Sequence, residues 1–302
     1  MNFCQRVSSL AIKSMLYEVS ASPKPGLVDR INQGAHNDMD FFTFMDSISV
    51  LFPYYEKCTQ VGLSFNENDY TGLMDSLRDV GIEAENNMFN ATRNVNTHKG
   101  MIFSLGILSA ALGSMQKDYN RNSFTRYEIQ DRVKKMTKGI TKELLHSKNK
   151  DYKDLTYGER LYRDYNISGI RGEAESGYET VISISLPEFE RLYNEHGKKD
   201  INNILIQTLI FLMSETEDSN ILGRHDVDVL KYVKDKSKIA INLGGIYTKE
   251  GQDYIDRLDK EFIKLNISSG GAADLLAVTL FIFLVEKGEL DEWRNVFKNS
   301  WF

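Results

Sequence analysis

Several residue types and patterns that mark whole classes of protein are scarce in this sequence of 302 residues. Its two cysteines, Cys4 and Cys58, form neither a disulfide framework nor a metal-ligand pattern, which indicates a reducing compartment. The longest apolar run, residues 275–285, is shorter than the roughly 20 residues of a membrane span, and residues 1–10 lack an apolar signal-peptide core. We therefore expect a cytoplasmic protein with no membrane segment.

An excess of positive charge is also missing. The net charge of -6 argues against a general affinity for nucleic acid or anionic membranes, so an anionic ligand must be met by local charges. The chain contains no Gly-x-x-x-x-Gly-Lys-Ser/Thr loop and no Gly-x-Gly-x-x-Gly fingerprint. These absences exclude the commonest phosphate-binding motifs.

Strand signals and linkers are almost absent. Only residues 180–186 show β-branched residues at strand-like alternation, and this run has no obvious partner. Apolar residues recur at helical spacing in many segments: 7–15, 41–55, 71–92, 101–112, 121–147, 201–213, 227–240, 254–265 and 275–285. No stretch rich in Pro, Gly or Ser divides the chain. We predict an all-α protein with a single multi-helix domain over residues 1–302.

Helix ends are predicted from the residues that begin or interrupt these patterns. Asn37 or Asp38 is placed to cap the helix at 41–55, and Pro53 is expected to kink or end it. Ser268 or Ser269 is expected to cap the last apolar helix.

The loop at residues 22–39 carries far more ionisable chemistry than a connection between helices requires. Pro23 and Pro25 hold the backbone extended on either side of Lys24. Four other polar clusters lie at the edges of apolar helices: 96–100, 158–173, 218–224 and 268–274. We expect these five clusters to converge on one pocket.

Basic residues in these clusters are candidates for phosphate contacts, with surface charges or structural ion pairs as the alternative explanation. They are Lys24, Arg30, Lys99, Arg171 and Arg224. The Gly270-Gly271 turn before the last helix could present backbone N–H groups to an anion, or it could be an ordinary turn.

Carboxylates in the same clusters are candidates to bind Mg²⁺, which prefers oxygen ligands and is commonly shared with substrate phosphates. They are Asp29, Asp38, Glu173, Asp218 and Asp274. Capping is the alternative for Asp38, whereas Asp274 lies inside an apolar helix and would need a buried partner.

Two histidines, His36 and His98, could carry protons or donate hydrogen bonds to phosphate, or they could brace their loops. From these residues alone we infer a helical protein with a phosphate or nucleotide pocket.

Six ordered motifs, spread over nearly the whole chain, resemble the triphosphoribosyl-dephospho-CoA synthase family. They are Pro-Lys-Pro-Gly-Leu-Val-Asp-Arg at 23–30, Gly-Ala-His-Asn-Asp-Met at 34–39, Asn-Thr-His-Lys-Gly at 96–100, Gly-Ile-Arg-Gly-Glu-Ala at 169–174, Asp-Ser-Asn-Ile-Leu-Gly-Arg at 218–224 and Gly-Gly-Ala-Ala-Asp-Leu-Leu-Ala at 270–277. Six motifs in order are far more specific than any one of them.

The resemblance implies an all-helical transferase that joins ATP to 3′-dephospho-CoA. Adenine is released, and the triphosphoribosyl group passes to the ribose 2′-hydroxyl of dephospho-CoA. The product is the precursor of the prosthetic group of citrate lyase or malonate decarboxylase, which a later transferase attaches to the acyl carrier protein.

Site roles follow from this reaction as hypotheses. The triphosphate calls for Mg²⁺ and for cations, here Lys24, Lys99, Arg171 and Arg224. Metal binding or base catalysis is assigned to Asp29, Asp38, Glu173 and Asp218, and His98 and Asp274 are placed in the same pocket.

Two other functions remain open. Helical folds with clustered aspartates can also form Mg²⁺-dependent N-glycohydrolases of the ADP-ribose type, in which water is the acceptor. A non-enzymatic helical scaffold is the third possibility.

Overall fold

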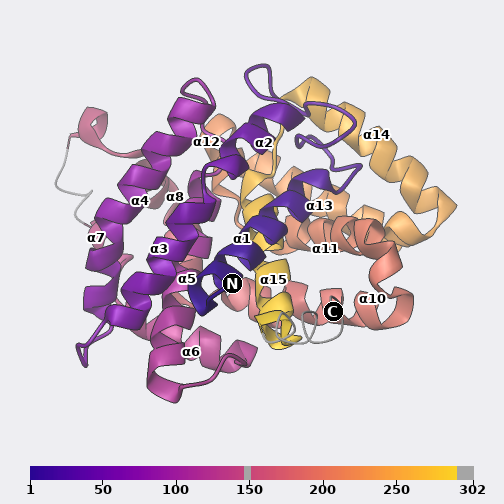
Figure 1. Cartoon of the computed structure of the whole chain (residues 1–302). Helices are drawn as coiled ribbons and strands as arrows, with labels where there is room; N and C mark the ends of the chain where they lie inside the picture. The colour runs from indigo at the N-terminus through magenta and orange to yellow at the C-terminus, as the bar shows by residue number, and fades with distance from the viewer. Residues whose placement is uncertain (146–150, 291–302) are drawn as a thin grey trace.

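Helices form nearly all the regular structure of the chain in the computed structural model, which describes residues 1–145 and 151–290 (Figure 1). No strand occurs within these residues, so the all-α prediction is confirmed. None of their helices is both long enough and apolar enough to cross a membrane.

The α-helices are α1 (Phe3–Ser20), α2 (Phe41–Ser49), α3 (Phe52–Ser64), α4 (Thr71–Ala91), α5 (Lys99–Tyr119), α6 (Arg126–Thr137), α7 (Lys142–Leu145), α8 (Tyr157–Tyr165), α9 (Gly169–Glu175), α10 (Leu186–His196), α11 (Ile201–Glu215), α12 (Ser219–Arg224), α13 (Val227–Asn242), α14 (Lys249–Leu265) and α15 (Gly270–Glu286). The short helical turns are η2 (Tyr152–Asp154), the π-helix η3 (Val181–Ser185), η4 (Lys198–Asp200) and η5 (Gly245–Tyr247).

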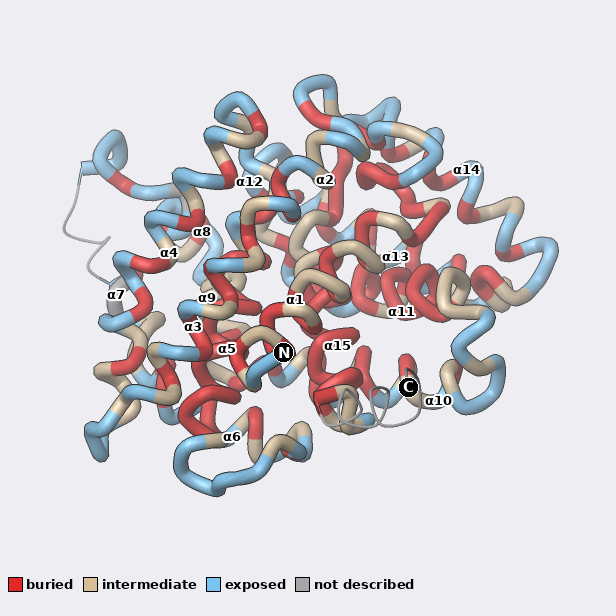
Figure 2. Tube along the Cα trace, viewed as in Figure 1, coloured by how far each residue is buried: buried red, intermediate tan, exposed pale blue. Residues whose placement is uncertain are grey.

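Helix α15 lies at the centre of the bundle and joins its two halves. It packs against α1, α5 and α11, with α3, α4 and α6 beyond α5 and with α13 and α14 beyond α11 (Figure 1). Every residue from Leu275 to Val285 is buried, as Figure 2 shows along this helix. The apolar run is therefore the core helix that the sequence predicts, and its polar N-terminal end is left to face the candidate site.

The segment predicted as one helix over 41–55 is two helices, because the chain turns at Val50 and Leu51 between α2 and α3. Pro53 lies in the first turn of α3, where its missing N–H group costs no hydrogen bond. The prediction of Asn37 or Asp38 as the cap is wrong, since the Asp40 side chain accepts the hydrogen bond from the Thr43 backbone N–H.

Two other sequence predictions need correction. The segment 121–147 is interrupted after α6 at Gly139, whose φ of +86° breaks the helix, and its last two residues lie outside the described ones. The strand-like run at 180–186 is helical. Its β-branched residues Val181 and Ile182 belong to η3 and are buried in the core of the bundle. Ser269 does occupy the cap position of α15, but its side chain makes no capping bond.

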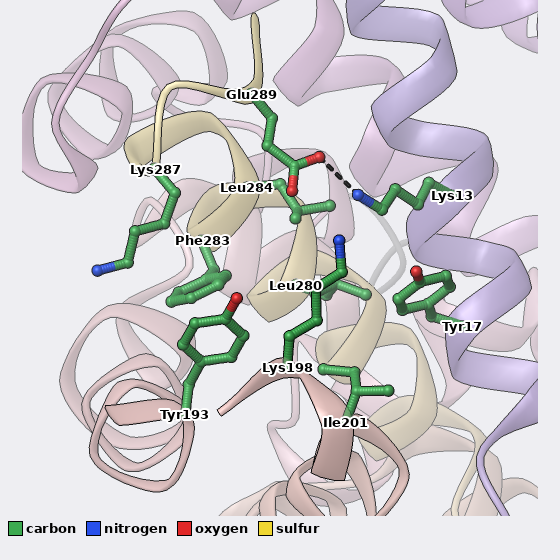
Figure 3. A pocket seen from close by; sticks show the side chains of 10 residues that line it. All are labelled: Lys13, Tyr17, Tyr193, Lys198, Ile201, Leu280, Phe283, Leu284, Lys287 and Glu289. Atoms are coloured by element: carbon green, nitrogen blue, oxygen red, sulfur yellow. Dashed lines mark hydrogen bonds and ion pairs between the residues drawn. The ribbon is translucent and has the colours of Figure 1, made fainter. Parts of the chain in front are cut away.

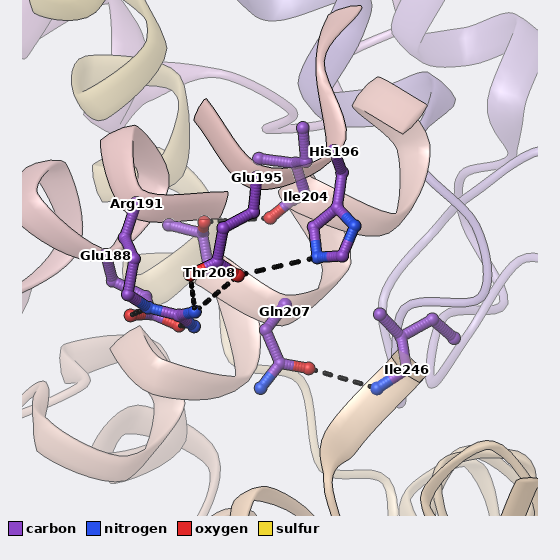
Figure 4. A network of polar contacts seen from close by, with 8 residues as sticks. All are labelled: Glu188, Arg191, Glu195, His196, Ile204, Gln207, Thr208 and Ile246. Carbon is purple, nitrogen blue, oxygen red and sulfur yellow. Dashed lines mark hydrogen bonds and ion pairs between the residues drawn. The ribbon is translucent and has the colours of Figure 1, made fainter. Parts of the chain in front are cut away.

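Polar contacts fix the helices on one side of the core (Figure 4). The side-chain oxygen of Gln207 on α11 accepts a hydrogen bond from the Ile246 backbone N–H at 3.0 Å. On α10, the guanidinium of Arg191 pairs with Glu188 at 2.7 Å and with Glu195 at 2.8 Å. The first contact ties η5 to α11, whereas the second stabilises the outer face of α10.

Candidate active site

Two adjoining cavities lie where the polar clusters of the sequence come together. The larger cavity has a volume of about 520 Å³ and the smaller one about 260 Å³. Five residues line both cavities: Asn96, Lys99, Gly100, Asn220 and Asp274. The distant loops therefore do meet at one place, where two cavities adjoin and share a wall made of these five residues.

The loop between α1 and α2 is held in shape by the carboxylate of Asp29, which is 2% exposed. Its Oδ2 accepts a hydrogen bond from the Lys24 backbone N–H at 2.9 Å. Its Oδ1 accepts from the backbone N–H groups of Ile31 at 2.6 Å and Asn32 at 3.1 Å. Both oxygens are thus engaged by the loop backbone, and Asp29 lines neither cavity.

Two further contacts attach this loop to the bundle. Asp259 on α14 accepts hydrogen bonds from the Gly26 backbone at 2.9 Å and from the Asn32 side chain at 3.0 Å. Arg30 is exposed and donates to the side chain of Asn202 on α11 at 3.1 Å. Arg30 lines neither cavity, so the structure gives it a contact between the loop and α11.

A buried ion pair forms the floor of the smaller cavity. The Nζ atom of Lys24 pairs with the carboxylate of Glu18 on α1, and each side chain is only 2% exposed. Burial raises the pKa of Glu18, although the charge of Lys24 opposes this shift. The ion pair therefore holds the Nζ atom of Lys24 beside the cavity.

His36 links three parts of the chain at the mouth of the smaller cavity. Its Nε2 lies 3.0 Å from the Ser268 hydroxyl, and its Nδ1 lies 3.2 Å from the guanidinium of Arg224 and 3.7 Å from the Asp38 carboxylate. Burial, and after it the charge of Arg224, lowers the pKa of His36. The Arg224 guanidinium donates to Nδ1, so a neutral ring carries its proton on Nε2 and donates to Ser268.

Asp218 joins the N-terminal ends of α12 and α15. Its Oδ1 accepts from the backbone N–H groups of Asn220 at 2.8 Å and Ile221 at 3.3 Å, and its Oδ2 accepts from that of Ala272 at 2.9 Å. A Cβ atom at Gly271 would lie 3.0 Å from this carboxylate. Because these hydrogen bonds come from both helices, the Asp218 carboxylate, which is only 2% exposed, connects the two helix ends.

The shared wall contains the contact between Asp274 on α15 and Gly100 on α5. Burial is the largest cause that raises the pKa of Asp274 well above its usual value, and the nearby carboxylates Glu18 and Asp218 add to it. The side chain stays open to both cavities. Gly270 lines the smaller cavity and Gly271 the larger one.

Glu173 on α9 lines the larger cavity with one oxygen unpaired. Its Oε1 accepts a hydrogen bond from the Thr180 hydroxyl at 2.6 Å, whereas its Oε2 is buried and has no hydrogen-bond partner. Burial raises the pKa of this carboxyl. An orphaned carboxylate oxygen beside a cavity is the arrangement expected where a ligand supplies the missing donor.

His98 and Lys99 are neighbours in sequence with different surroundings. His98 is fully buried, its Nδ1 lies 2.7 Å from the Ser47 hydroxyl, and it lines neither cavity. Burial, and after it the charge of Lys24, lowers the pKa of His98 to about 3, so the ring is neutral. Lys99 lines both cavities, and its Nζ lies 2.8 Å from the Glu85 carboxylate of α4.

The structure brings together some of the predicted phosphate-binding cations and separates others. Lys24, Lys99 and Arg224 line the smaller cavity. Arg171 lies instead in a third cavity, beside α4 and α5. The cluster at 158–173 therefore contributes Gly169, Gly172 and Glu173 to the larger cavity but directs its arginine elsewhere.

The five predicted metal-binding carboxylates do not form one cluster. Across residues 1–145 and 151–290, no group of three or more His, Cys, Asp or Glu side chains is placed to hold a metal ion. Asp38 and Asp274 line the smaller cavity, and Glu173 and Asp274 the larger one.

Sequence reasoning missed Glu18, Asn96 and Asn220 as cavity residues. Asn96 and Asn220 lie inside the polar clusters, but a search for ionisable groups passes over amides. For Glu18 a signal existed, because a carboxylate between the apolar residues Met15 and Val19 needs a buried partner.

A separate cavity of about 290 Å³ lies between α1, α10 and the C-terminal half of α15 (Figure 3). It is lined by aromatic side chains and by lysines, one of which, Lys13, pairs with Glu289 at 2.5 Å. It contains none of the predicted site residues.

The model of the CitG family, described as ATP:dephospho-CoA triphosphoribosyl transferase, matches residues 4–292. No solved structure matches the chain.

Curated relatives carry related names. A probable 2-(5''-triphosphoribosyl)-3'-dephosphocoenzyme-A synthase of Lactiplantibacillus plantarum is 40% identical, covering 91% of this chain and 95% of the relative. A relative of the same name from Streptococcus equi subsp. equi is 37% identical, covering 93% of this chain and 96% of the relative. Protein CitXG of Leuconostoc mesenteroides subsp. cremoris is 39% identical, over 92% of this chain but only 58% of its own length. The family model and these relatives confirm the resemblance: the chain belongs to the ATP:dephospho-CoA triphosphoribosyl transferase family and is an ATP-using transferase.

Proposed function

We propose that ATP and 3′-dephospho-CoA bind in the two adjoining cavities and react where these meet. The observation that carries this proposal is the shared wall, which faces both cavities at Lys99, Gly100 and Asp274. Two nucleotides bound on either side would bring a donor sugar and an acceptor sugar together there. Holding both in contact removes much of the entropic barrier to a two-substrate reaction.

The triphosphate of ATP is assigned to the smaller cavity. Three cationic side chains line it, Lys24, Lys99 and Arg224, and α15 begins at its edge at Gly270. Lysine and arginine bind phosphate by charge and by hydrogen bonds, and the N-terminus of a helix favours an anion. The ribose of ATP then lies at the shared wall.

The transfer breaks the bond between the ribose C1′ and the adenine N9 and forms a bond from C1′ to the 2′-oxygen of dephospho-CoA. Glu173 is the proposed base, since its Oε2 has no hydrogen-bond partner and its raised pKa suits proton transfer nearer neutral pH. The electron pair of the broken bond leaves with adenine, which ends with the proton lost by the hydroxyl. Asp274 faces the sugar, and the positive charge that develops there favours the ionised form of this carboxyl, against the burial that raises its pKa.

Magnesium fits this site as an ion carried mainly by the triphosphate. Mg²⁺ is commonly held by one or two carboxylates together with substrate phosphates, and Asp38 and Asp274 line the phosphate-binding cavity. Asp29 and Asp218 are weaker candidates, because their oxygens accept backbone hydrogen bonds. When bound, the ion would neutralise phosphate charge.

The product of this reaction would be 2′-(5-triphosphoribosyl)-3′-dephospho-CoA, made in the cytoplasm. It would serve as the prosthetic-group precursor of citrate lyase or malonate decarboxylase, delivered to the acyl carrier protein by a later transferase.

The test is an assay of adenine release and product mass with ATP, Mg²⁺ and dephospho-CoA. The proposal requires adenine to form only when dephospho-CoA is present, together with a product carrying the added triphosphoribosyl mass. Adenine released without the acceptor would favour the glycohydrolase instead. No release under either condition would favour the scaffold.

A further inference from the structure

A third cavity forms a groove between α4 and α5, with a volume of about 330 Å³. We call it the α4–α5 groove. Its lining is largely apolar: Met74, Leu77, Ile82, Ile102, Phe103 and Ile107. Ile82 is 59% exposed and Phe103 and Met74 are only partly buried, so the groove presents apolar surface to its surroundings. The smaller catalytic cavity, in contrast, is lined mainly by polar and charged side chains.

One face of α5 runs from the shared wall to the groove. Lys99, Phe103 and Ile107 are spaced four residues apart and therefore lie in one row on the helix. Lys99 lines both catalytic cavities, whereas Phe103 and Ile107 line the groove. This row rises by about 12 Å, at about 1.5 Å per residue.

Charged residues lie between the groove and the catalytic cavities, which have no lining residue in common with it. Glu85 lines the groove, and its carboxylate lies 2.8 Å from the Nζ of Lys99. On α9, Ile170, Gly172 and Glu173 line the larger cavity. Arg171, which lies between Ile170 and Gly172 in the sequence, lines the groove instead. Lys99 and Arg171 thus flank the boundary between a polar site and an apolar one.

We propose that the α4–α5 groove binds the pantetheine arm of dephospho-CoA. This proposal rests on the proposed function, because it extends the acceptor bound in the larger cavity. Dephospho-CoA consists of an adenosine, a diphosphate and a long, largely uncharged arm, in that order. The adenosine lies in the larger cavity, the diphosphate meets Arg171 at the boundary, and the arm follows the apolar row of α5.

Gly81 on α4 allows the groove to be filled without disturbing the catalytic cavities. It lines the groove, and a Cβ atom there would meet only the Tyr54 hydroxyl, at 3.9 Å. A leucine at this position therefore has room to enter the groove, and replacing a glycine inside a helix favours the helix. Asn86→Leu, at an exposed position of the same helix, is the matched control.

The experiment compares two acceptors, dephospho-CoA and ADP, which lacks the pantetheine arm. Gly81→Leu should raise KM for dephospho-CoA at least tenfold while leaving KM for ATP and the use of ADP within twofold of the unmodified protein. Asn86→Leu should change none of these values. Ile82→Glu, at the exposed edge of the groove, should reproduce the selective effect and guards against misfolding of the first variant.

Two results would overturn the proposal: an unchanged KM for dephospho-CoA in both groove variants, or an equal loss with ADP. Calorimetric binding of dephospho-CoA separates this proposal from the transfer reaction itself. If no adenine is released but dephospho-CoA binds and Gly81→Leu weakens that binding tenfold, the groove is correct and the reaction is not. If adenine is released normally and the variant binds dephospho-CoA normally, the reaction is correct and the groove is not.

Discussion

A Cβ atom placed on Gly100 would lie 1.8 Å from the Oδ2 atom of Asp274. Gly100 is in the first turn of α5 and Asp274 is near the start of α15, so the two helix ends meet at this point. No side chain other than hydrogen fits between them. The position of the Asp274 carboxylate, at the wall that both cavities share, therefore depends on a glycine 174 residues earlier in the chain.

Gly100→Ala should remove most turnover, because the added methyl group must push the Asp274 carboxylate out of place. Forced overpacking of this kind commonly costs about 1–3 kcal/mol of stability as well. Adenine release and urea unfolding measure the two effects. Gly158→Ala is the control, since a Cβ atom there meets no atom within 4 Å. Turnover of Gly100→Ala within twofold of the unmodified protein would contradict the assigned place of Asp274.

Lys24→Met should destabilise the protein by about 3–5 kcal/mol near neutral pH, because it leaves the buried Glu18 carboxylate without its partner. The double variant Glu18→Leu/Lys24→Met should recover most of this stability, since neither charge then remains buried. Turnover should stay low in both, because the phosphate-binding charge is missing. Urea unfolding with an adenine assay checks this, and a double variant with normal turnover would exclude Lys24 from phosphate binding.

Glu173→Gln should lower turnover by about 10²–10⁴-fold, the range usual for a lost general base. The fold should persist, because the amide oxygen can still accept the hydrogen bond from Thr180. Calorimetry should show that ATP still binds. Glu179→Gln, at an exposed position nearby, should behave as the unmodified protein does. If Glu173→Gln keeps normal turnover, the base is another residue.

His98 should make the protein less stable as the pH falls below about 6.5, the usual pKa of histidine. The unfolded chain takes up a proton there, whereas the folded His98, with a pKa of about 3, does not. Through His98 the free energy of unfolding falls by at most about 1.4 kcal/mol per pH unit. His98→Gln should reduce the drop in the urea midpoint between pH 7 and pH 5. Equal drops in His98→Gln and the unmodified protein would show that His98 titrates normally.

The helices could be predicted from the sequence because their signal is local. Val7, Leu10, Ala11 and Met15 recur at helical spacing, and all four are buried along α1. The run from Leu275 to Val285 is apolar on every side and is buried on every side. Local patterns were less informative where a helix is broken, since the turn between α2 and α3 and the interruption at Gly139 depend on packing against other helices.

The sequence by itself determined the all-α class, the family and the five polar clusters that supply both cavities, because helical periodicity and ordered motifs are written in neighbouring residues. Only the tertiary structure decided what each charged side chain does. Asp29 and Asp218 have oxygens that accept backbone N–H groups, whereas Glu173 has a free oxygen and Asp274 faces both cavities. The role of a carboxylate depends on which donors reach it, and here these include donors from distant segments: the Ala272 N–H that engages Asp218 lies 54 positions away.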